Sequence, residues 1–287
     1  MKMILFPSDY FDINKADESF KNEYETVLES GNFETLLFSY DDWTAERKLK
    51  FDRKIDRFTD TIYRGWMMKP EVYADFYNAL KKKNISLITE PSQYTRFHSF
   101  PNIYPKLQED TAKMLVYADA DKINLQEIKN TFSKFMIKDY VKSVKGTDFP
   151  KFIGSDMNEK DFQMLIRKFL EYRGELYTGG ICIKEYLDLK LYDNKTNEYR
   201  VFYMNNKIAT VSRNSGQPCY TPEPPKELID KYKNLSSPFY TVDYAERSDG
   251  TWKIIEAGDG QVSGLSDNQN IRNFYRSMSV IFESISD

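Results

Sequence analysis

The sequence of 287 residues contains a single histidine, His98, and only two cysteines, Cys182 and Cys219. One histidine argues against a Ser-His-Asp mechanism and against a histidine-rich zinc site. The cysteines lack metal-ligand spacing, so we expect reduced thiols. His98 lies between aromatic residues, and we expect it in a structural loop rather than as a catalytic base. Any catalysis is therefore expected to use carboxylates, lysines, arginines and a metal ion.

Long apolar runs are also missing. The N-terminal segment MKMILFPSDYFD has an apolar run too short for a signal peptide, and no stretch approaches the roughly 20 apolar residues of a membrane span. The net charge of -3 gives no basic field to attract nucleic acid or an acidic membrane surface. We expect a cytoplasmic protein without membrane association. The sequence does not indicate which oligomeric state the protein has.

The first third of the chain alternates strand and helix patterns, which predicts a mostly parallel α/β layer. Pro70 opens the clearest helix, PEVYADFYNALKKKN, which has an apolar face and lysines in its last turn. The expected strands are 2–7, 36–40, 60–66 and 86–89, and the expected helices are about 17–30 and 70–84.

From about residue 130 the strand patterns become longer and more aromatic, which predicts antiparallel sheets. Asn205-Asn206 is a tight-turn signal, and Asn158 and Gly174 are the expected caps of a helix. The expected strands lie in KFMIKDYVKSV, GICIKEYLDLKLYD, EYRVFYMNNKIATVSR and a terminal hairpin, and further helices are expected near 225–235 and 268–284.

Near the C-terminus, FYTVDYAE and TWKIIEA flank Ser248-Asp249-Gly250, a strong hairpin signal. Asp243 and Glu256 are close to equidistant from this turn, so they are expected to face each other. Two carboxylates held that close repel unless a cation lies between them, and Mg²⁺ with phosphate oxygens is the common solution. Ordinary solvated acids on an edge hairpin are the alternative. The glycine-rich AGDGQVSG that follows lets backbone approach a ligand closely.

The C-terminal half presents its motifs in a characteristic order: FMIKDYVKSV, a helix, IKEYLDL, EYRVF and then the acidic hairpin. This order resembles the ATP-grasp superfamily, in which two α+β lobes grip ATP. The resemblance implies a mixed α/β and α+β protein with an N-terminal pre-ATP-grasp α/β domain at 1–118 and a two-lobed ATP-grasp domain at 119–287.

Nearly the whole chain resembles a narrower group. TIYRGWMMKPEVYADFYNALKKKNISLITEP, YTRFHSFPNIYP and EAGDGQVSGL look like a clade of stand-alone ATP-grasp amidoligases defined by two arginines and a lysine. The resemblance implies ATP- and Mg²⁺-dependent ligation of a carboxylate to an amine through an acyl phosphate. One departure is that Gly258, followed by Asp259, stands where many ATP-grasp ligases have an asparagine, which leaves the third metal ligand open.

The resemblance also implies roles for individual residues. Arg64, at a strand end, could meet a substrate carboxylate, since a parallel α/β layer binds ligands beyond the carboxyl ends of its strands. Ile183 and Ile255 could sandwich adenine. The expected phosphate and hinge residues are Lys138, Lys184, Glu185, Tyr186, Leu187 and Asp188, the expected arginines on γ-phosphate and acyl phosphate are Arg200 or Arg213, and the expected metal ligands are Asp243, Glu256 and Asp259.

Simpler explanations exist for several of these residues. Lys142 and Lys145 lie in the same lysine-rich stretch as Lys138, and alternate lysines on an edge strand often only oppose aggregation. Glu198 and Arg200 share a strand face and could form a surface ion pair. Arg213 could merely end a strand.

The expected partners are ATP, Mg²⁺, and small-molecule or peptide carboxylate and amine substrates. An amino acid, a peptide, a protein terminus and an amino-acid-decorated nucleic acid all remain open as acceptors. Two other functions are compatible with the same fold. One is phosphoryl transfer or nucleic-acid end joining, and the other is a non-catalytic nucleotide-binding module.

Overall fold

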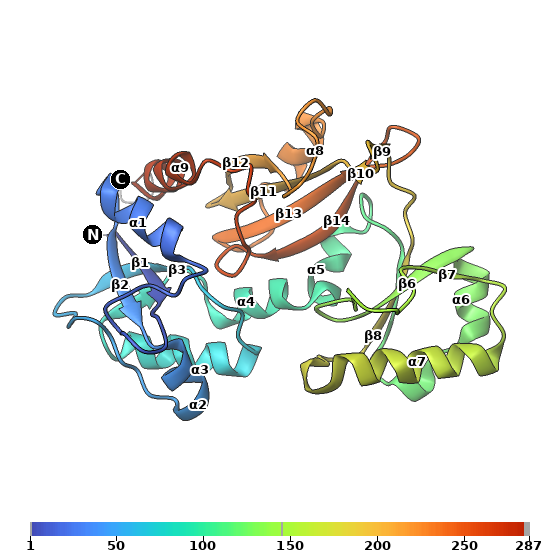
Figure 1. Ribbon diagram of the computed structural model, residues 1–287, viewed down its shortest axis with the longest axis horizontal. Coiled ribbons are helices and arrows are strands. Elements are labelled where there is room, and N and C mark those ends of the chain that lie inside the picture. The colour runs from blue at the N-terminus through green and yellow to red at the C-terminus, as the bar shows by residue number, and fades with distance from the viewer. Residues whose placement is uncertain (1, 145, 284–287) are drawn as a thin grey trace.

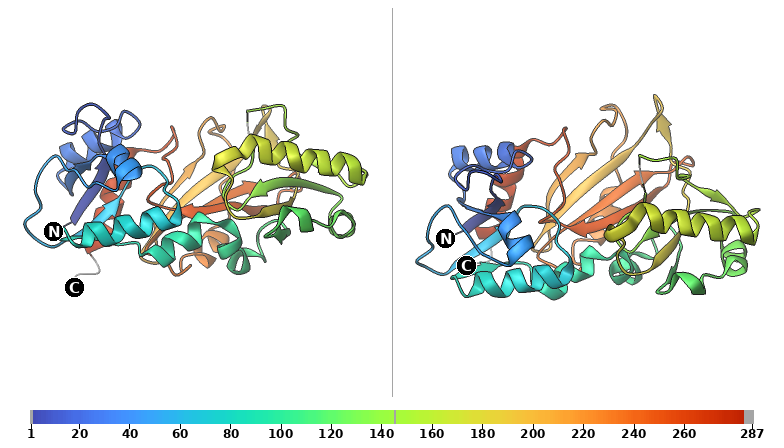
Figure 2. Two further views of the ribbon diagram at one scale, coloured as in Figure 1. Left: turned by 90° about the horizontal axis from the view of Figure 1, so that it is seen from below. Right: turned by 60° about the horizontal axis from the view of Figure 1, so that its bottom comes forward.

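The computed structural model describes residues 2–144 and 146–283. Lys145 and Ser284, which belong to predicted segments, lie outside the described residues. The described residues form three four-stranded sheets and a two-stranded ribbon, arranged along an elongated molecule (Figures 1 and 2). No helix in the described ranges is long and apolar enough to cross a membrane.

The N-terminal sheet is parallel, as predicted, with the strand order β2-β1-β3-β4. The C-terminal helix α9 packs against α1 at this sheet (Figure 1), where Phe274 and Met278 join the core of Ile4 and Val27. The elements are β1 (Lys2–Pro7), α1 (Lys21–Ser30), β2 (Glu34–Phe38), α2 (Tyr40–Glu46), β3 (Thr59–Tyr63), α3 (Pro70–Lys81), β4 (Ile85–Leu87) and α9 (Ile271–Glu283).

Two helices, α4 (Pro91–His98) and α5 (Phe100–Leu107), occupy the segment around His98. The prediction of a loop here was wrong. Pro91 lies in the first turn of α4, and Glu90 and Gln93 form a capping box that satisfies free backbone donors. The extended Ser99 separates the two helices. Together they run along the central sheet toward the second lobe (Figure 1).

The second sheet is antiparallel, with the order β5-β8-β6-β7, and α7 lies along it (Figure 2). The chain enters and leaves this lobe side by side, since the Glu185 amide donates to the Lys113 carbonyl at 2.8 Å. Asn158 caps α7 as predicted. The elements are β5 (Met114–Tyr117), η1 (Ala120–Lys122), α6 (Leu125–Thr131), β6 (Lys134–Asp139), β7 (Ile153–Gly154), α7 (Glu159–Arg173), η2 (Gly174–Leu176) and β8 (Ile181–Glu185).

Strand β6 is shorter than the predicted KFMIKDYVKSV strand. The Asp139 carboxylate accepts hydrogen bonds from the Val141 and Lys142 amides at 2.7 and 2.6 Å. These bonds turn the chain directly after Asp139. Lys142 therefore lies in a loop, while Lys138 stays on the strand.

The central sheet is also antiparallel, with the order β12-β11-β13-β14. Both predicted hairpins are confirmed. Asn205 and Asn206 take left-handed φ angles of 47° and 61°, as a primed hairpin turn requires. The strands of the central sheet are β11 (Glu198–Met204), β12 (Lys207–Arg213), β13 (Phe239–Glu246) and β14 (Trp252–Asp259). The same part of the chain contains helix α8 (Lys226–Lys231) and the two-stranded ribbon of β9 (Leu191–Tyr192) and β10 (Lys195–Thr196).

Candidate functional site

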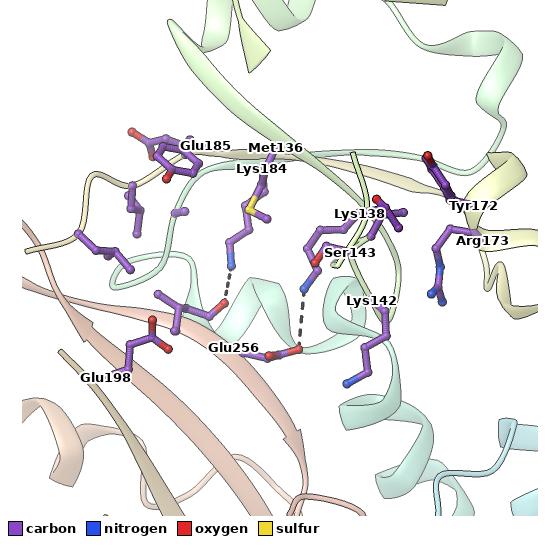
Figure 3. A pocket seen from close by; sticks show the side chains of 17 residues that line it. Met136, Lys138, Lys142, Ser143, Tyr172, Arg173, Lys184, Glu185, Glu198 and Glu256 are labelled. Carbon is purple, nitrogen blue, oxygen red and sulfur yellow. Dashed lines mark hydrogen bonds and ion pairs between the residues drawn. The ribbon is translucent and has the colours of Figure 1, made fainter. Parts of the chain in front are cut away.

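A cavity of about 610 Å³ separates the second sheet from the central sheet. Lys138 on β6 and Lys184 on β8 extend from one side toward β14 on the other (Figure 3). The Lys138 ammonium lies 3.9 Å from the Glu256 carboxylate, and the Lys184 ammonium donates to the Ile255 carbonyl at 2.7 Å. Two lysines and an acid thus meet across the cavity.

Two β-bulges in the central sheet determine which of its side chains face the cavity. Between β13 and β14, Tyr244 pairs with Ile254 but Asp243 pairs with Glu256, so Ile255 is the extra residue. The bulge places Glu256 directly opposite Asp243, as the sequence predicts. It also leaves the Ile255 carbonyl free of the ladder, where Lys184 binds it.

Lys184 is almost fully buried. Burial and the nearby Lys138 cation lower the pKa of the Lys184 ammonium to about 7. Near neutral pH, part of the population therefore lacks the proton. An anionic ligand in the cavity would favour the charged form.

Nucleotide binding is accordingly expected to take up protons. Phosphate beside Lys184 should raise its pKa from about 7, so the affinity for ADP should increase as pH falls from 8 toward 7. Calorimetry in buffers of different ionisation enthalpy measures this uptake. Lys184→Arg should keep the affinity and lose this part of the uptake, because a guanidinium stays protonated. Equal uptake in both proteins would contradict the assignment.

The acids opposite the lysines differ in their surroundings. Arg200 on β11 binds both Asp243 carboxylate oxygens at 2.8 and 2.7 Å. Burial raises the pKa of Asp243 above its usual value, although Arg200 opposes this. For Glu256, burial also favours the neutral form, but Lys138, Lys142 and Arg200 outweigh it and lower the pKa. The two acids thus differ in the direction of their pKa shifts, and 39% of the Glu256 side chain is exposed.

The two facing carboxylates fit a magnesium ion that completes its shell with phosphate oxygens and water, which is the usual protein site for Mg²⁺. Within residues 2–144 and 146–283, no three acidic, histidine or cysteine side chains are grouped to hold a metal. The predicted third ligand, Asp259, is not brought to this pair. It follows Gly258 at the end of β14, where its Oδ1 accepts hydrogen bonds from the Gln261 amide and side chain, both at 3.0 Å.

Glu185, Tyr186 and Leu187, the residues expected at the adenine hinge, line the cavity. Asp188 does not, because its carboxylate pairs with Lys134 at 2.9 Å. Ile183 is also turned away, into the core of its own lobe. Met136 lines the cavity where Ile183 was expected to do so. Ile255, the other residue expected beside adenine, also lines the cavity.

Arg213 does not reach the cavity. It lies over the Tyr199 ring, with its guanidinium carbon 5.1 Å from the ring centre, and donates to the Thr221 carbonyl at 3.1 Å. The second bulge, between Phe202 and Tyr203 on the β11–β12 pair, places Arg213 opposite Tyr199. Alternation then puts it on the other face from Arg200.

Arg64 is fully buried, and its donors are taken up by this chain. It forms an ion pair with Glu23 at 3.0 Å and donates to the carbonyls of Gly260 and Ser263 at 2.6 and 2.8 Å. Tyr275 on α9 donates to the same Glu23 carboxylate. The structure does not present Arg64 to a substrate carboxylate. It fastens the loop after β14 to α1 and, through Glu23, to α9.

Several residues that line the cavity were missed from the sequence, and most of them lie in the loop after β6 or at the end of α7, whose positions depend on the fold. Arg173, for example, pairs with Asp139 at 2.7 Å. The missed residues are Ala112, Met136, Ser143, Val144, Thr147, Tyr172, Arg173 and Leu189.

Two lobes that close on a cavity lined by lysines and acids define the ATP-grasp fold. Solved structures agree with it at low sequence identity. A D-alanyl-alanine synthetase A from Vibrio cholerae has a TM-score of 0.60 at 9% identity, covering 100% of this chain and 98% of that one. An ATP-grasp ligase, PsnB, complexed with a minimal precursor has a TM-score of 0.62 at 10% identity, covering 98% of both chains. A RiPP-associated ATP-grasp ligase from Chryseobacterium gregarium, in complex with ADP and a leader and core peptide, has a TM-score of 0.61 at 11% identity, covering 99% and 97%.

The family follows from the sequence. Residues 122–278, more than half of the chain, match the family described as ATP-grasp domain, R2K clade family 3. The chain belongs to this family. A sequence comparison with curated proteins finds no significant match.

Proposed function

We propose that this protein is an ATP- and Mg²⁺-dependent ligase that joins a carboxylate to an amine through an acyl phosphate, as an amidoligase of the two-arginine, one-lysine type. The observation that carries the proposal is the placement of Lys138 and Lys184 across the 610 Å³ cavity from the Asp243–Glu256 pair. Among the solved proteins of similar fold, PsnB is complexed with a minimal precursor, the Chryseobacterium ligase is in complex with a leader and core peptide, and the Vibrio protein is a D-alanyl-alanine synthetase, which supports small-molecule or peptide carboxylate and amine substrates here.

Each side chain has a role in this proposal. Phosphoryl transfer needs positioning and cations more than covalent help from the protein. Lys138 and Lys184 bind the phosphates, and Glu185, Tyr186 and Leu187 lie beside the adenine. Arg200 orients Asp243 and neutralises it.

Asp243 and Glu256 would hold the magnesium ion, which supplies positive charge at the phosphate oxygens when it is bound. We further propose the division of the chain into a pre-ATP-grasp domain at 1–118 and an ATP-grasp domain at 119–287. This boundary follows the end of β5 at Tyr117, although β5 pairs with β8 and therefore lies in the sheet of the following lobe.

The test is a hydroxylamine trap. Purified protein is incubated with ATP, Mg²⁺ and single carboxylates drawn from amino acids and short peptides, and hydroxamate and ADP are measured. A ligase of this type should give both products with at least one carboxylate. A stable phosphorylated product without hydroxamate would indicate a phosphotransferase. Joined nucleic-acid ends would indicate the end-joining alternative, and nucleotide binding without ADP formation a non-catalytic module.

Lys138→Ala should raise the KM for ATP and lower kcat together, because a phosphate-binding lysine acts in both the ground and transition states. The loss of a charge-assisted contact is about 1.5–3 kcal/mol, or roughly a 10- to 150-fold drop in kcat/KM. Lys160→Ala, at an exposed lysine on α7 of the same lobe, is the matched control. Kinetics within about twofold of the unmodified protein would mean that Lys138 is only a strand lysine.

A further inference from the structure

A second, smaller cavity of about 130 Å³ adjoins the first. It lies over the edge strand β14, between that strand, the α4–α5 segment and the loop after β6. Lys142 and Glu256 line both cavities, so they form the wall between them. The volume is several times the ~10–15 Å³ that one water needs, which leaves room for the end of a small substrate.

Two buried polar atoms in this cavity have no hydrogen-bond partner among the described residues, Asp259 Oδ2 and His98 Nδ1. Only 2% of Asp259 and 7% of His98 are exposed. A buried polar atom without a partner costs about 1–3 kcal/mol. The other Asp259 oxygen is already bound by Gln261. Two side chains from different elements thus line one small cavity with unused hydrogen-bonding capacity.

The hydrogen-bonding chemistry of Asp259 and His98 indicates which class of ligand the cavity can bind. Burial raises the pKa of Asp259 to about 7, and a positively charged group beside it favours the ionised form, whose oxygens only accept hydrogen bonds. A second carboxylate would be repelled by that form. Burial lowers the pKa of His98, which favours a neutral ring that can also accept. The Arg200 guanidinium, which lines the same cavity, is already bound to Asp243. This part of the cavity therefore suits a hydrogen-bond donor with positive charge.

We propose that this cavity is the acceptor subsite, and that Asp259 Oδ2 and His98 Nδ1 bind the primary amino group of the nucleophile. The proposal rests on the proposed ligase function and adds a place for its second substrate. The amine would lie across the Glu256–Lys142 wall from the nucleotide. For reaction, the ammonium would give one proton to the neutral His98 ring, and its nitrogen lone pair would attack the carbonyl carbon of the acyl phosphate. The C–N bond would form as the C–O bond to phosphate breaks, and phosphate would leave with that electron pair and take up the second proton.

The single histidine makes the test specific, because only His98 contributes imidazole signals to the NMR spectrum. The full chain, saturated with Mg²⁺ and ADP, is titrated separately with methylammonium, acetate and methanol. Methylammonium should shift the His98 signals saturably, and the other two should not. In Asp259→Asn its apparent affinity should fall at least fivefold, while Asp75→Asn, at an exposed acid on α3, should match the unmodified protein.

Three results would overturn the proposal: no saturable shift with methylammonium, a shift with acetate instead, or unchanged affinity in Asp259→Asn. Calorimetry with Mg²⁺ and ADP on the same samples separates the two hypotheses. Absent nucleotide binding would refute the ligase function, whereas nucleotide binding without methylammonium binding would refute only the acceptor subsite.

A second variant covers the case in which Asp259→Asn does not fold. His98→Gln keeps a polar group of smaller size, and saturation-transfer NMR on the methyl protons of methylammonium reports binding without the imidazole. Its affinity should fall at least threefold. An affinity equal to that of the unmodified protein would remove His98 from the subsite.

Discussion

Glu256→Gln should abolish turnover and leave the fold intact. Glutamine keeps the shape of the side chain but removes the charge that faces Lys138 and pairs across the ladder with Asp243. We expect a loss in kcat of roughly 100-fold or more, the scale for removing one preorganised electrostatic group. Hydroxamate formation from the best carboxylate in the trapping screen measures it.

The assignment of Glu256 as a magnesium ligand can also be tested by a binding measurement, which does not depend on turnover. Added Mg²⁺ should strengthen ADP binding to the unmodified protein in calorimetry and should do so much less for Glu256→Gln. Glu25→Gln, at an exposed acid on α1, controls for the loss of a negative charge. Normal ATP consumption by Glu256→Gln would refute the metal role of this residue.

Arg64→Met should destabilise the protein by about 3–5 kcal/mol, because it leaves the buried Glu23 carboxylate without its counter-charge. The carbonyls of Gly260 and Ser263 also lose their donor. The midpoint of thermal or urea unfolding measures the change. A melting temperature equal to that of the unmodified protein would show that the buried pair contributes little to stability.

A double variant separates lost charge balance from lost packing. Arg64→Met combined with Glu23→Gln removes both charges, so it should be more stable than Arg64→Met alone. If the two proteins unfold at the same midpoint, the loss of stability comes instead from the carbonyls of the loop after β14, which lose their hydrogen-bond donor.

Local signals predicted most of the fold. The two hairpin turns are readable in the sequence because Asn205, Asn206 and Gly250 take left-handed φ angles, which few residues accept. Asn158 marks the start of α7 for a similar local reason, since its side chain caps the first turn. The segment around His98 was misjudged because its aromatic residues suggested a loop, while the capping box at Glu90 favoured a helix.

The site was predicted where residues lie close to a hairpin turn, although even the Asp243–Glu256 pair depends on the bulge at Ile255. It was missed where a more distant bulge or a tertiary contact positions the side chain. Without the bulge between Phe202 and Tyr203, Arg213 would lie opposite Glu198 and share the face of Arg200. Nothing in the local sequence predicts the extra residue of this bulge. The burial of Arg64 depends on Glu23 and on the loop after β14, which are distant in sequence. Motif spacing cannot supply such contacts.

The hydrogen bond between the Glu185 amide and the Lys113 carbonyl makes the β5–β8 lobe an exchangeable cassette. Because its two chain crossings are adjacent, two splice points suffice to replace everything between them, and inserted units with neighbouring ends are well tolerated. A chimaera that carries the corresponding segment of another ATP-grasp protein would keep Asp243, Glu256, His98 and Asp259 of the host, while Val141 and Lys142, which also line the small cavity, would be replaced with the cassette. Nucleotide preference should then follow the donor of the cassette, and the choice of amine should follow the host.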